Sequence, residues 1–281
     1  MQNLGNKNVF EDYWDRLGKT WLGKRPIGEL WRRHNDASVG ALLVGWLGNR
    51  SASRLLKTDI FEEGISKGLY PLLATKAKLI FAIDVSMPLI RAAWGRYPSL
   101  RLVQCDVLKP AFLAESFDVI VSTSTLDHFP AITGLREALK SLSSLLAPGG
   151  ELFITLDNLA NPIIALRNAI PHEQRMRMGL TPYYVGATCR PAQLNNYLIE
   201  AGLGVVEMTA VVHFPRMPGM LLGRLLERYN CHRAALRLLA MMQRFEALSW
   251  APTKYLTGHF IAARAVKLYS NLHNPVGHNE A

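Results

Sequence analysis

The chain has 281 residues, enough for one large hydrophobic core with a smaller cap, and contains no apolar run of the roughly 18 residues that cross a bilayer. Its formal charge of +10 favours anionic ligands or surfaces in general, but the basic residues form no dense block, so we expect no nucleic-acid partner. Cys105, Cys189 and Cys231 lie too far apart for a Cys-x-x-Cys metal site or a disulfide framework, and with no secretory signal pattern they favour a cytoplasmic protein without a metal.

Residues 1–50 are expected to form a helical amino-terminal cap. The segment is rich in tryptophan, at Trp14, Trp21, Trp31 and Trp46. Its helical pattern is broken near Gly23 and Pro26. Aromatic side chains in such a segment normally pack on the body of a domain, and some of them can also line a ligand cleft.

Short apolar runs that follow one another along the chain indicate an open parallel sheet. Four of them lie at residues 54–58, 79–83, 100–105 and 117–122, and a fifth, 151–156, follows a helix-ending turn at 146–150. Asp84 and Asp106 directly follow the second and third runs, at the strand ends where such sheets bind ligands. One carboxylate there can accept hydrogen bonds from both hydroxyls of a ribose, and the next can reach an adenine amine. The two acids therefore indicate a nucleoside site.

The order of these features resembles the class I S-adenosylmethionine-dependent methyltransferases, in the small-molecule group that includes the quinone methyltransferases. The resemblance depends on the two acids, the Phe-Asp-Val-Ile strand and the Leu-Ala-Pro-Gly-Gly turn, and it extends from about Arg54 to Gly204. It implies an α/β fold, a Rossmann-like sheet of seven strands with the last one antiparallel, and S-adenosylmethionine as the cofactor. It also implies that Asp84 and Asp106 bind the cofactor together with residues beside the strand ends, namely Val85, Ser86, Val107, Ser122 and Thr123.

The first loop departs from the pattern of that family. The usual Gly-x-Gly-x-Gly sequence, in which backbone amides approach the methionine end of the cofactor, is replaced by Asp-Ile-Phe-Glu-Glu-Gly. Only Gly64 and Gly68 remain. We expect Asp59, Glu62 or Glu63 to hold the ammonium group of the cofactor instead. The alternative is that the two glutamates only stabilise the start of a helix, where acids are favoured.

Residues 122–130 follow the fourth strand and are expected to face the transferred methyl group. His128 could deprotonate an acceptor hydroxyl, because histidine has an ordinary pKa of about 6.5, and Asp127 could orient it. A structural role for this histidine is the competing interpretation, since the sulfonium is already an activated donor and alignment can suffice. Asp157 and Asn158, after the fifth strand, are candidate substrate contacts or turn formers.

The cofactor-binding core is expected to span residues 51–214 and to contain a substrate-binding insertion around residues 160–190. Arg167, Tyr183 and Tyr184 in that insertion suit an anionic, partly apolar acceptor, although a solvated insertion would look similar. An ordinary helix is predicted at residues 191–201.

The last two strands are predicted at residues 204–214 and 255–264, paired like a hairpin. Residues 215–252 between them form a basic amphipathic helical insertion, which can pack on its own domain, cover an apolar substrate pocket, or lie on a membrane surface. We favour packing on the domain. Residues 253–281 then contain the last strand and a carboxyl-terminal tail.

The function predicted from these features is methyl transfer to a small acceptor, partly apolar and able to be anionic, with oxygen favoured over carbon or nitrogen. A non-catalytic regulatory or scaffold subunit with the same fold is the alternative, because the first loop has lost its glycines. A nicotinamide-dependent oxidoreductase would also explain Asp84, but it explains neither Asp106 nor the Pro-Gly-Gly turn.

Overall fold

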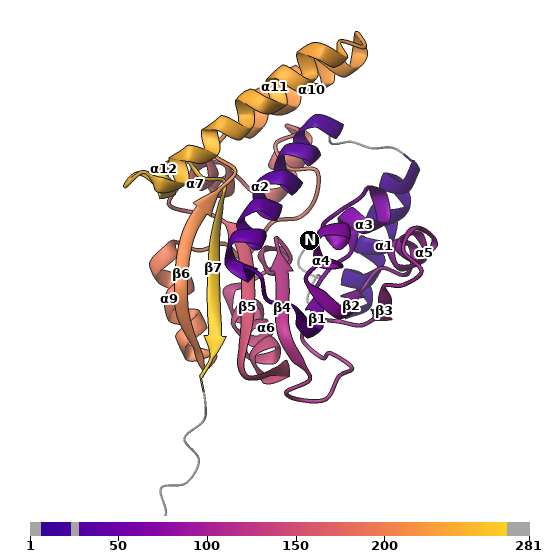
Figure 1. Ribbon diagram of the computed structural model, residues 1–281. Coiled ribbons are helices and arrows are strands. Elements are labelled where there is room, and N and C mark those ends of the chain that lie inside the picture. The colour runs from indigo at the N-terminus through magenta and orange to yellow at the C-terminus, as the bar shows by residue number, and fades with distance from the viewer. Residues whose placement is uncertain (1–6, 24–27, 269–281) are drawn as a thin grey trace, which may run out of the picture.

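The computed structural model describes residues 7–23 and 28–268, which form a seven-stranded sheet with helices on both faces (Figure 1). The strands lie in the order β3-β2-β1-β4-β5-β7-β6. Their bounds are β1 Ala52–Lys57, β2 Ala77–Asp84, β3 Arg101–Gln104, β4 Phe117–Thr123, β5 Leu146–Asp157, β6 Leu203–Val211 and β7 Phe260–Lys267. Strands β1 to β5 are parallel, and β7 runs antiparallel to both β5 and β6. The predicted Rossmann-like sheet with an antiparallel last strand is confirmed.

Helices cover the two faces of this sheet unequally. α6 and α9 lie on one face, and α2, α3 and α5 lie over the other (Figure 1). The α-helices are α1 Lys7–Gly23, α2 Glu29–Leu47, α3 Phe61–Ile65, α4 Tyr70–Leu73, α5 Met87–Arg96, α6 Ile132–Leu145, α7 Pro162–Ala169, α8 His172–Arg177, α9 Pro191–Glu200, α10 Arg216–Arg228, α11 His232–Arg244 and α12 Lys254–Thr257. Two 3-10 helices, η1 Leu126–His128 and η2 Phe245–Trp250, complete the description.

Successive residues of the central strands contribute to opposite cores, because side chains alternate along a strand. In β4, Val119 and Val121 pack in the core beneath α2 and α5, whereas Ile120 packs in the core beneath α6 and α9. Phe153 and Leu152 of β5 divide in the same way. Both faces are therefore dry, which explains why these strands are nearly continuous apolar runs in the sequence.

Two helices, α1 and α2, make up most of the described part of the amino-terminal segment. α1 ends at Gly23, where a break was expected, and Pro26 lies outside the described residues. α1 packs beside α3 and α5, whereas α2 packs beside α10 and α11. Trp21, Trp31 and Trp46 join the hydrophobic core, so most of the expected tryptophan packing is confirmed.

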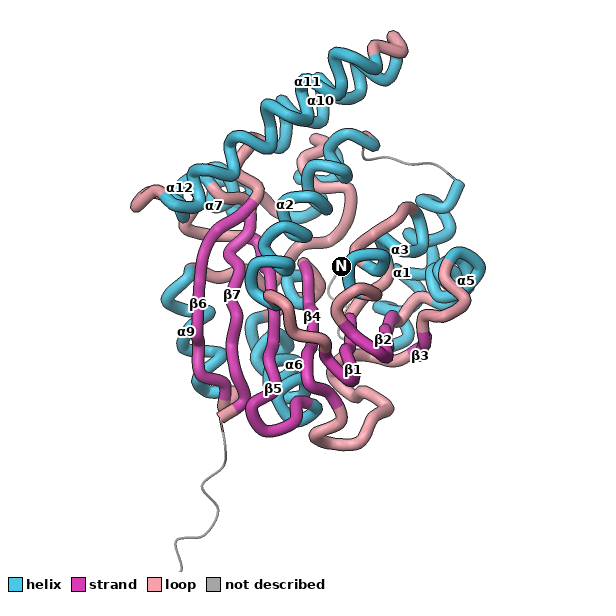
Figure 2. The backbone as a smooth tube through the Cα atoms, viewed as in Figure 1, coloured by secondary structure: helices cyan, strands magenta, loops and turns pink. Residues whose placement is uncertain are grey.

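The insertion between β6 and β7 forms a helical hairpin of α10 and α11 that extends beyond the body of the molecule over α2 (Figure 2). Close packing against α2 depends on Gly219, because a Cβ atom there would lie 2.8 Å from the Trp31 ring. Among the described residues, no helix combines the length and the apolar character needed to cross a membrane.

The turn predicted at residues 146–150 is partly wrong. α6 does end at Leu145, but β5 begins at once, and Leu146 pairs with Phe117 of β4. The strand bends at Gly149, where φ is +74°, and the pairing register shifts before Val119. The Pro-Gly-Gly sequence therefore bends the start of a strand.

The bounds predicted for the last two strands also need correction. β6 ends at Val211, because Val212 has a φ of +61° and its N–H bonds the Glu246 carboxylate (3.0 Å). Residues 254–257 form α12, and β7 starts only at Phe260. The Asn158 side chain donates to the carbonyls of Tyr255 (2.7 Å) and Gly258 (3.0 Å), which holds this segment out of the sheet. The predicted tail beyond residue 268 lies outside the described residues.

Candidate functional site

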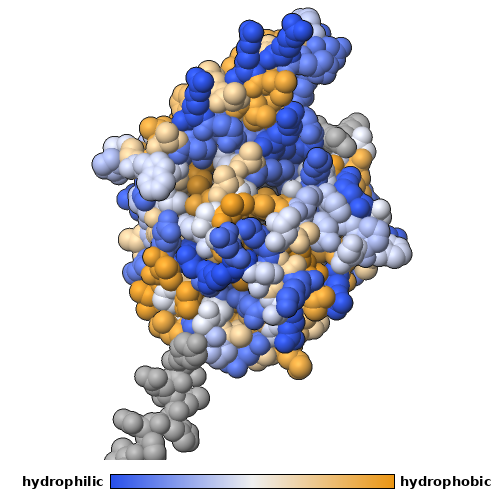
Figure 3. Space-filling model, in the orientation of Figure 1, coloured by the Kyte–Doolittle hydropathy of each residue, from blue (hydrophilic) through white to orange (hydrophobic). Residues whose placement is uncertain are grey.

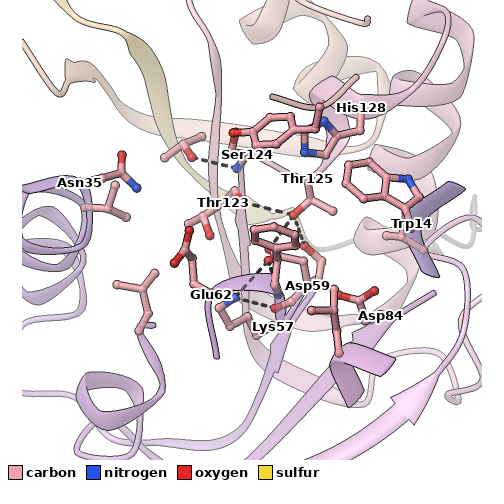
Figure 4. Close-up of a pocket in the computed structure, with 18 of the residues that line it drawn as sticks. Trp14, Asn35, Lys57, Asp59, Glu62, Asp84, Thr123, Ser124, Thr125 and His128 are labelled. Carbon is pink, nitrogen blue, oxygen red and sulfur yellow. Dashed lines mark hydrogen bonds and ion pairs between the residues drawn. The ribbon is translucent and has the colours of Figure 1, made fainter. Parts of the chain in front are cut away.

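A deep cavity opens at the carboxyl ends of the parallel strands (Figure 4). Residues at or just past these strand ends form its floor: Thr58, Asp59, Asp84, Val85, Cys105, Asp106, Val107, Thr123, Ser124, Thr125 and Thr155. α1 and α2 supply one wall, and Tyr183, Arg216, His259 and Phe260 supply another. Seven of the predicted cofactor residues lie in this lining, namely Asp59, Glu62, Asp84, Val85, Asp106, Val107 and Thr123.

The formal charge of the described lining residues is opposite in sign to that of the chain. Among the described residues, five acids line the cavity, Asp36, Asp59, Glu62, Asp84 and Asp106, against three bases, Arg32, Lys57 and Arg216. The whole chain has a formal charge of +10. An acidic cavity in a basic protein suits a ligand that carries positive charge.

Asp84 is held by the backbone at the end of β2. Its Oδ1 accepts the N–H of Ser86 (2.8 Å) and its Oδ2 accepts the N–H of Ile60 (3.1 Å). A carboxylate has about four lone-pair positions, so two remain for a ligand. Burial raises the pKa of Asp84 to about 7, and the nearby Asp59 adds to the effect, while the two amides oppose it. Ser86 thus positions Asp84 and does not itself line the cavity.

Asp106 lies next to Asp84 along the same edge of the sheet. Asp84 pairs with Gln104 in the β2–β3 ladder, and the N–H of Cys105 donates to the carbonyl of Asp84 (3.1 Å). Asp106 Oδ1 accepts the N–H of Leu108 (2.9 Å), which fixes the carboxylate at the cavity. The structure therefore places the two predicted acids side by side.

Part of the glycine-poor first loop is occupied by an internal ion pair. Lys57 Nζ lies 3.0 Å from Glu63 Oε2, and both side chains are almost completely buried. Glu63 Oε1 accepts the N–H of Leu69 (2.9 Å) and of Tyr70 (3.1 Å). The chain passes close to this carboxyl group at Gly68, where φ is +56° and a Cβ would lie 2.5 Å from Glu63. Glu63 is therefore a structural residue and is the wrong candidate for the ammonium contact.

Asp59 and Gly64 also have internal roles in this loop. Asp59 Oδ2 accepts the hydroxyl of Thr125 (2.9 Å), and Oδ1 lies 3.5 Å from Lys57 Nζ. Gly64 does not face the cavity: it lies inside α3, where a Cβ would meet Leu89 of α5 at 3.0 Å. Gly64 thus allows two helices to pack closely, which corrects its predicted role beside the cofactor.

Glu62 in the first loop also faces the cavity, and its Oε2 accepts a hydrogen bond from the Ser66 hydroxyl (3.1 Å). Burial raises its pKa to about 8, and the negative charge of Asp36 on α2 raises it further, while Arg32 lowers it. Burial likewise raises the pKa of Asp36 to about 7. A cationic ligand beside Glu62 and Asp36 would stabilise the ionised form of both carboxyl groups.

A basic and an amide side chain from α2 complete this end of the cavity. Arg32 is 4% exposed, and its Nη2 bonds Glu29 (2.7 Å), while its Nε and Nη1 make no hydrogen bond with the described residues. Asn35 Oδ1 is also buried and accepts no hydrogen bond from the described residues. Buried donors and acceptors that lack protein partners usually meet water or a ligand. Cationic and anionic groups therefore face each other here, as an amino acid zwitterion requires.

His128 lies across the cavity, with its ring fixed by the backbone. Nδ1 lies 2.7 Å from the carbonyl oxygen of Tyr184, so the neutral ring donates from Nδ1 and leaves the Nε2 lone pair available. Asp127 Oδ1 is 3.8 Å from Nε2, too far for a hydrogen bond, and Asp127 is 1% exposed. The Tyr184 carbonyl, and not Asp127, orients the ring. Burial raises the pKa of Asp127 to about 6.

Aromatic rings pack around His128. The ring centroids of Trp14 and Tyr183 lie 4.8 Å and 5.2 Å from that of His128. Trp14 comes from α1, and the hydroxyl of Tyr13 accepts the N–H of Tyr184 (2.8 Å), so α1 is tied to the loop before α9. Burial raises the pKa of Tyr183 to about 12, which keeps its hydroxyl protonated. The part of the cavity next to His128 is thus lined by aromatic rings.

Several predicted substrate residues lie outside the lining. Asp157 pairs with the buried Arg167 and lies 3.4 Å from His259 Nε2; burial opposes ionisation, but the Arg167 cation and the hydrogen bond from His259 hold the pKa of Asp157 well below its usual range. Asn158 holds the turn before β7, as described above. The side chain of Tyr184 packs on His172. Of the predicted substrate residues, only Tyr183 lines the cavity. The others make structural contacts outside its lining, namely Arg167, Asp157, Asn158 and Tyr184.

A further predicted cofactor residue lies outside the cavity, and several residues that line it were not predicted from the sequence. Ser122 accepts a hydrogen bond from the Thr58 hydroxyl (3.0 Å) and does not reach the cavity. Arg32, Asn35 and Asp36 were not predicted as site residues, although their spacing places them on one face of a helix. Nor was Arg216, whose basic character gave no signal within an arginine-rich insertion. No group of three or more potential metal ligands occurs among the described residues.

Comparison with known proteins agrees with this geometry. Residues 62–154 match the methyltransferase domain family. A probable S-adenosylmethionine-dependent methyltransferase of Mycobacterium tuberculosis is 22% identical over 172 residues, which cover 61% of this chain and 58% of the relative. A mouse protein named probable tRNA methyltransferase 9B is 34% identical over 71 residues, 25% of this chain and 15% of its own length. The chain thus spans less than two thirds of the length of the curated relatives that it matches.

Solved structures share the fold over most of the chain. The methyltransferase in a complex with the Trm112 activator of Haloferax volcanii has a TM-score of 0.58 at 15% identity, covering 94% of this chain and 99% of that one. A phosphoethanolamine N-methyltransferase of Haemonchus contortus has a TM-score of 0.57 at 16% identity, covering 92% and 60%. The cyclase SpnF also matches, with a TM-score of 0.53 at 18% identity, covering 82% and 80%. At such identities the likeness establishes the fold.

Proposed function

We propose that this chain, which contains a class I S-adenosylmethionine-dependent methyltransferase domain, transfers the methyl group of that cofactor to an oxygen atom of a small, partly apolar and anionic acceptor. The observation that carries the proposal is the acidic cavity of a basic chain. S-adenosylmethionine brings a sulfonium and an ammonium cation against one carboxylate. Three of the acids that face the cavity, Asp36, Glu62 and Asp84, have raised pKa values. A cationic ligand would lower these pKa values, because it would stabilise the ionised carboxylates.

The nucleoside end of the cofactor fits the edge formed by β2 and β3. Asp84 would accept hydrogen bonds from the ribose hydroxyls with the lone pairs that the Ile60 and Ser86 amides leave free. Asp106, one strand further along, would reach the adenine amine.

The methionine end fits the region between α2 and α3. Glu62 and Asp36 would hold the ammonium group, and the unpartnered nitrogens of Arg32 would hold the carboxylate. This arrangement replaces the missing glycines: side chains from α2 perform the binding that backbone amides of a glycine loop would otherwise perform. It therefore weakens the case for a non-catalytic subunit, which depended on that missing loop.

The acceptor would lie in the aromatic pocket beside His128. The cofactor supplies an electrophilic methyl group, and displacement at its carbon requires the acceptor oxygen to lie in line with the departing sulfur. His128 Nε2, free because Nδ1 donates to the Tyr184 carbonyl, would remove the acceptor proton. Trp14 and Tyr183 would hold an apolar, planar body, and Arg216 would bind an anionic substituent.

Calorimetric titration tests the cofactor part of the proposal. At pH 8 we expect S-adenosylmethionine and S-adenosylhomocysteine to bind the native chain, and Asp84→Asn to weaken both by about 10-fold to 100-fold, the value of charge-assisted hydrogen bonds of ~1.5–3 kcal/mol. The native affinity should fall below pH 7, because protonation of Asp84 removes acceptor positions, and the variant should show a weaker pH dependence, since Asp36 and Glu62 still titrate in this range. Asp118→Asn, an exposed acid outside the cavity, is the matched control. Undetectable binding at millimolar cofactor would favour the non-catalytic alternative.

Labelled cofactor tests the transfer step. The chain is incubated with methyl-labelled S-adenosylmethionine and a panel of phenols, alcohols and amines, each with and without a carboxylate substituent. Label should appear on oxygen, preferentially in the planar anionic members. Label on nitrogen alone would refute the oxygen acceptor, and cofactor binding without any transfer would leave the binding function and remove the enzymatic one.

A further inference from the structure

The α10–α11 hairpin has an apolar stripe that faces away from the protein. Its inner face packs on α2 through Gly219, Gly223, Leu238 and Met242. On the opposite face of α10, four exposed side chains recur every four residues, namely Met217, Leu221, Leu225 and Tyr229. Leu221 is 70% exposed, and Leu236 and Met241 on α11 are exposed as well. Large apolar side chains at helical spacing on a solvent-facing surface indicate an interaction site.

Arginines accompany this stripe, and acids do not. Residues 216–244 contain six arginines, at 216, 224, 228, 233, 237 and 244, and one acid, Glu227. Glu227 is exposed but bonds to α2, where its Oε1 accepts the N–H of Leu30 (3.1 Å). Figure 3 shows hydrophobic and strongly hydrophilic atoms interleaved on the projection above the body. The outer face of the hairpin is therefore apolar and positively charged at once.

From these features we infer that the α10–α11 hairpin docks on the surface of an anionic lipid bilayer. A helix pair with leucines facing outward and arginines beside them can bury its apolar side chains among acyl chains while its guanidinium groups bind lipid phosphates. Trp250, at the end of η2 after α11, is 92% exposed and suits the membrane interface, where tryptophan is enriched.

A second copy of the chain fits this surface less well. In a two-fold dimer the same patch meets itself, so the arginines of one hairpin would face those of the other without acids to compensate. A bilayer containing anionic lipids offers dispersed phosphates in place of a fixed positive surface.

The hairpin also lies beside the cavity. Arg216 begins α10 and lines the cavity, and Trp31 contacts Gly219 and lines it too. Docking would bring the aromatic pocket close to the lipid surface, where an amphiphilic acceptor would be concentrated. The docking itself requires no cofactor, so its test is independent of the proposed methyl transfer.

Vesicle flotation with the full chain tests the inference. The native chain should float with vesicles of phosphatidylcholine and phosphatidylglycerol and remain behind with phosphatidylcholine alone. Arg233→Glu combined with Arg237→Glu should lower the anionic-vesicle partition by more than about tenfold, since each basic residue near such a surface contributes roughly fivefold. Leu221→Glu should lower it severalfold. Circular dichroism establishes that each variant is folded.

Matched controls separate this hairpin from the general charge of the chain. Arg91→Glu with Lys140→Glu changes the net charge equally at exposed positions on α5 and α6, and Leu113→Glu replaces a leucine that is 83% exposed on another loop. Both controls should bind vesicles like the native chain. Failure of the native chain to float, or equal losses in the Arg91 control, would overturn the inference. So would a dimer in light scattering that Leu221→Glu converts to a monomer without any vesicle binding.

Discussion

Replacement of Glu62 by glutamine should make the cofactor-free protein more stable and the cofactor complex weaker. Glu62 faces the cavity beside Asp36, and burial raises its pKa from 4.5 to about 8. Between these two pH values the folded protein holds a proton that the unfolded chain has released. For an acid with a raised folded pKa, the stability contribution is present at low pH and is lost as the pH rises from about 4.5 to 8.

The gap between 4.5 and about 8 sets the size of the effect. It corresponds to at most ~5 kcal/mol, because one pKa unit is worth about 1.4 kcal/mol. Glu62 is partly exposed, so solvent reduces the cost, and we expect Glu62→Gln to raise the free energy of unfolding at pH 8 by about 2–3 kcal/mol. At pH 5 the native glutamate is protonated in the folded state, and the two proteins should differ little.

The assay combines unfolding and binding. Urea unfolding without cofactor is measured at pH 5 and pH 8, and calorimetry at pH 8 gives the affinity for S-adenosylmethionine, which should fall at least tenfold as the ammonium group loses its charged partner. Glu137→Gln, an exposed glutamate on α6, is the control and should change neither quantity. A variant that is less stable than the native protein at pH 8, or one with unchanged cofactor affinity, would refute the reasoning.

Two further predictions concern the acceptor side of the cavity. His128→Asn keeps a donor for the Tyr184 carbonyl but removes the base, so kcat should fall by about 10²-fold or more with unchanged cofactor affinity, as steady-state kinetics and calorimetry would show; a kcat within twofold of native would reduce His128 to an orienting role. Asp157→Asn leaves Arg167 buried without its counter-charge, so the free energy of unfolding should fall by about 3–5 kcal/mol in urea titrations. A loss below ~0.5 kcal/mol would show that the pair adds no net stability.

The fold could be predicted from the sequence because each strand carries its own signal. The runs at 79–83 and 117–122 contribute side chains to the cores on both faces of the sheet and are therefore mostly apolar, a pattern that is visible in the sequence alone. Asp84 and Asp106 could be placed because the topology of a parallel sheet brings the carboxyl ends of its strands to one edge. The start of β7 could not be placed, because the Asn158 side chain that holds residues 255–258 out of the sheet lies about a hundred residues away in the chain.

Contacts between segments that are distant in the chain could not be predicted from the sequence. Asp157 and Arg167 have the chemistry of substrate ligands, and only their mutual pairing in the interior reveals a structural role. Glu63 resembled Glu62 until the buried Lys57 distinguished them. Arg32 reaches the cavity because α2 packs over the sheet, a tertiary arrangement that no local pattern encodes.

A crystal structure of the complex with S-adenosylhomocysteine measures the central claim directly. The account predicts both ribose hydroxyls within hydrogen-bond distance of Asp84, the adenine amine at Asp106, and the methionine carboxylate at Arg32. A nucleoside bound away from Asp84, or a cavity that stays empty of saturating ligand while the protein is folded, would contradict it.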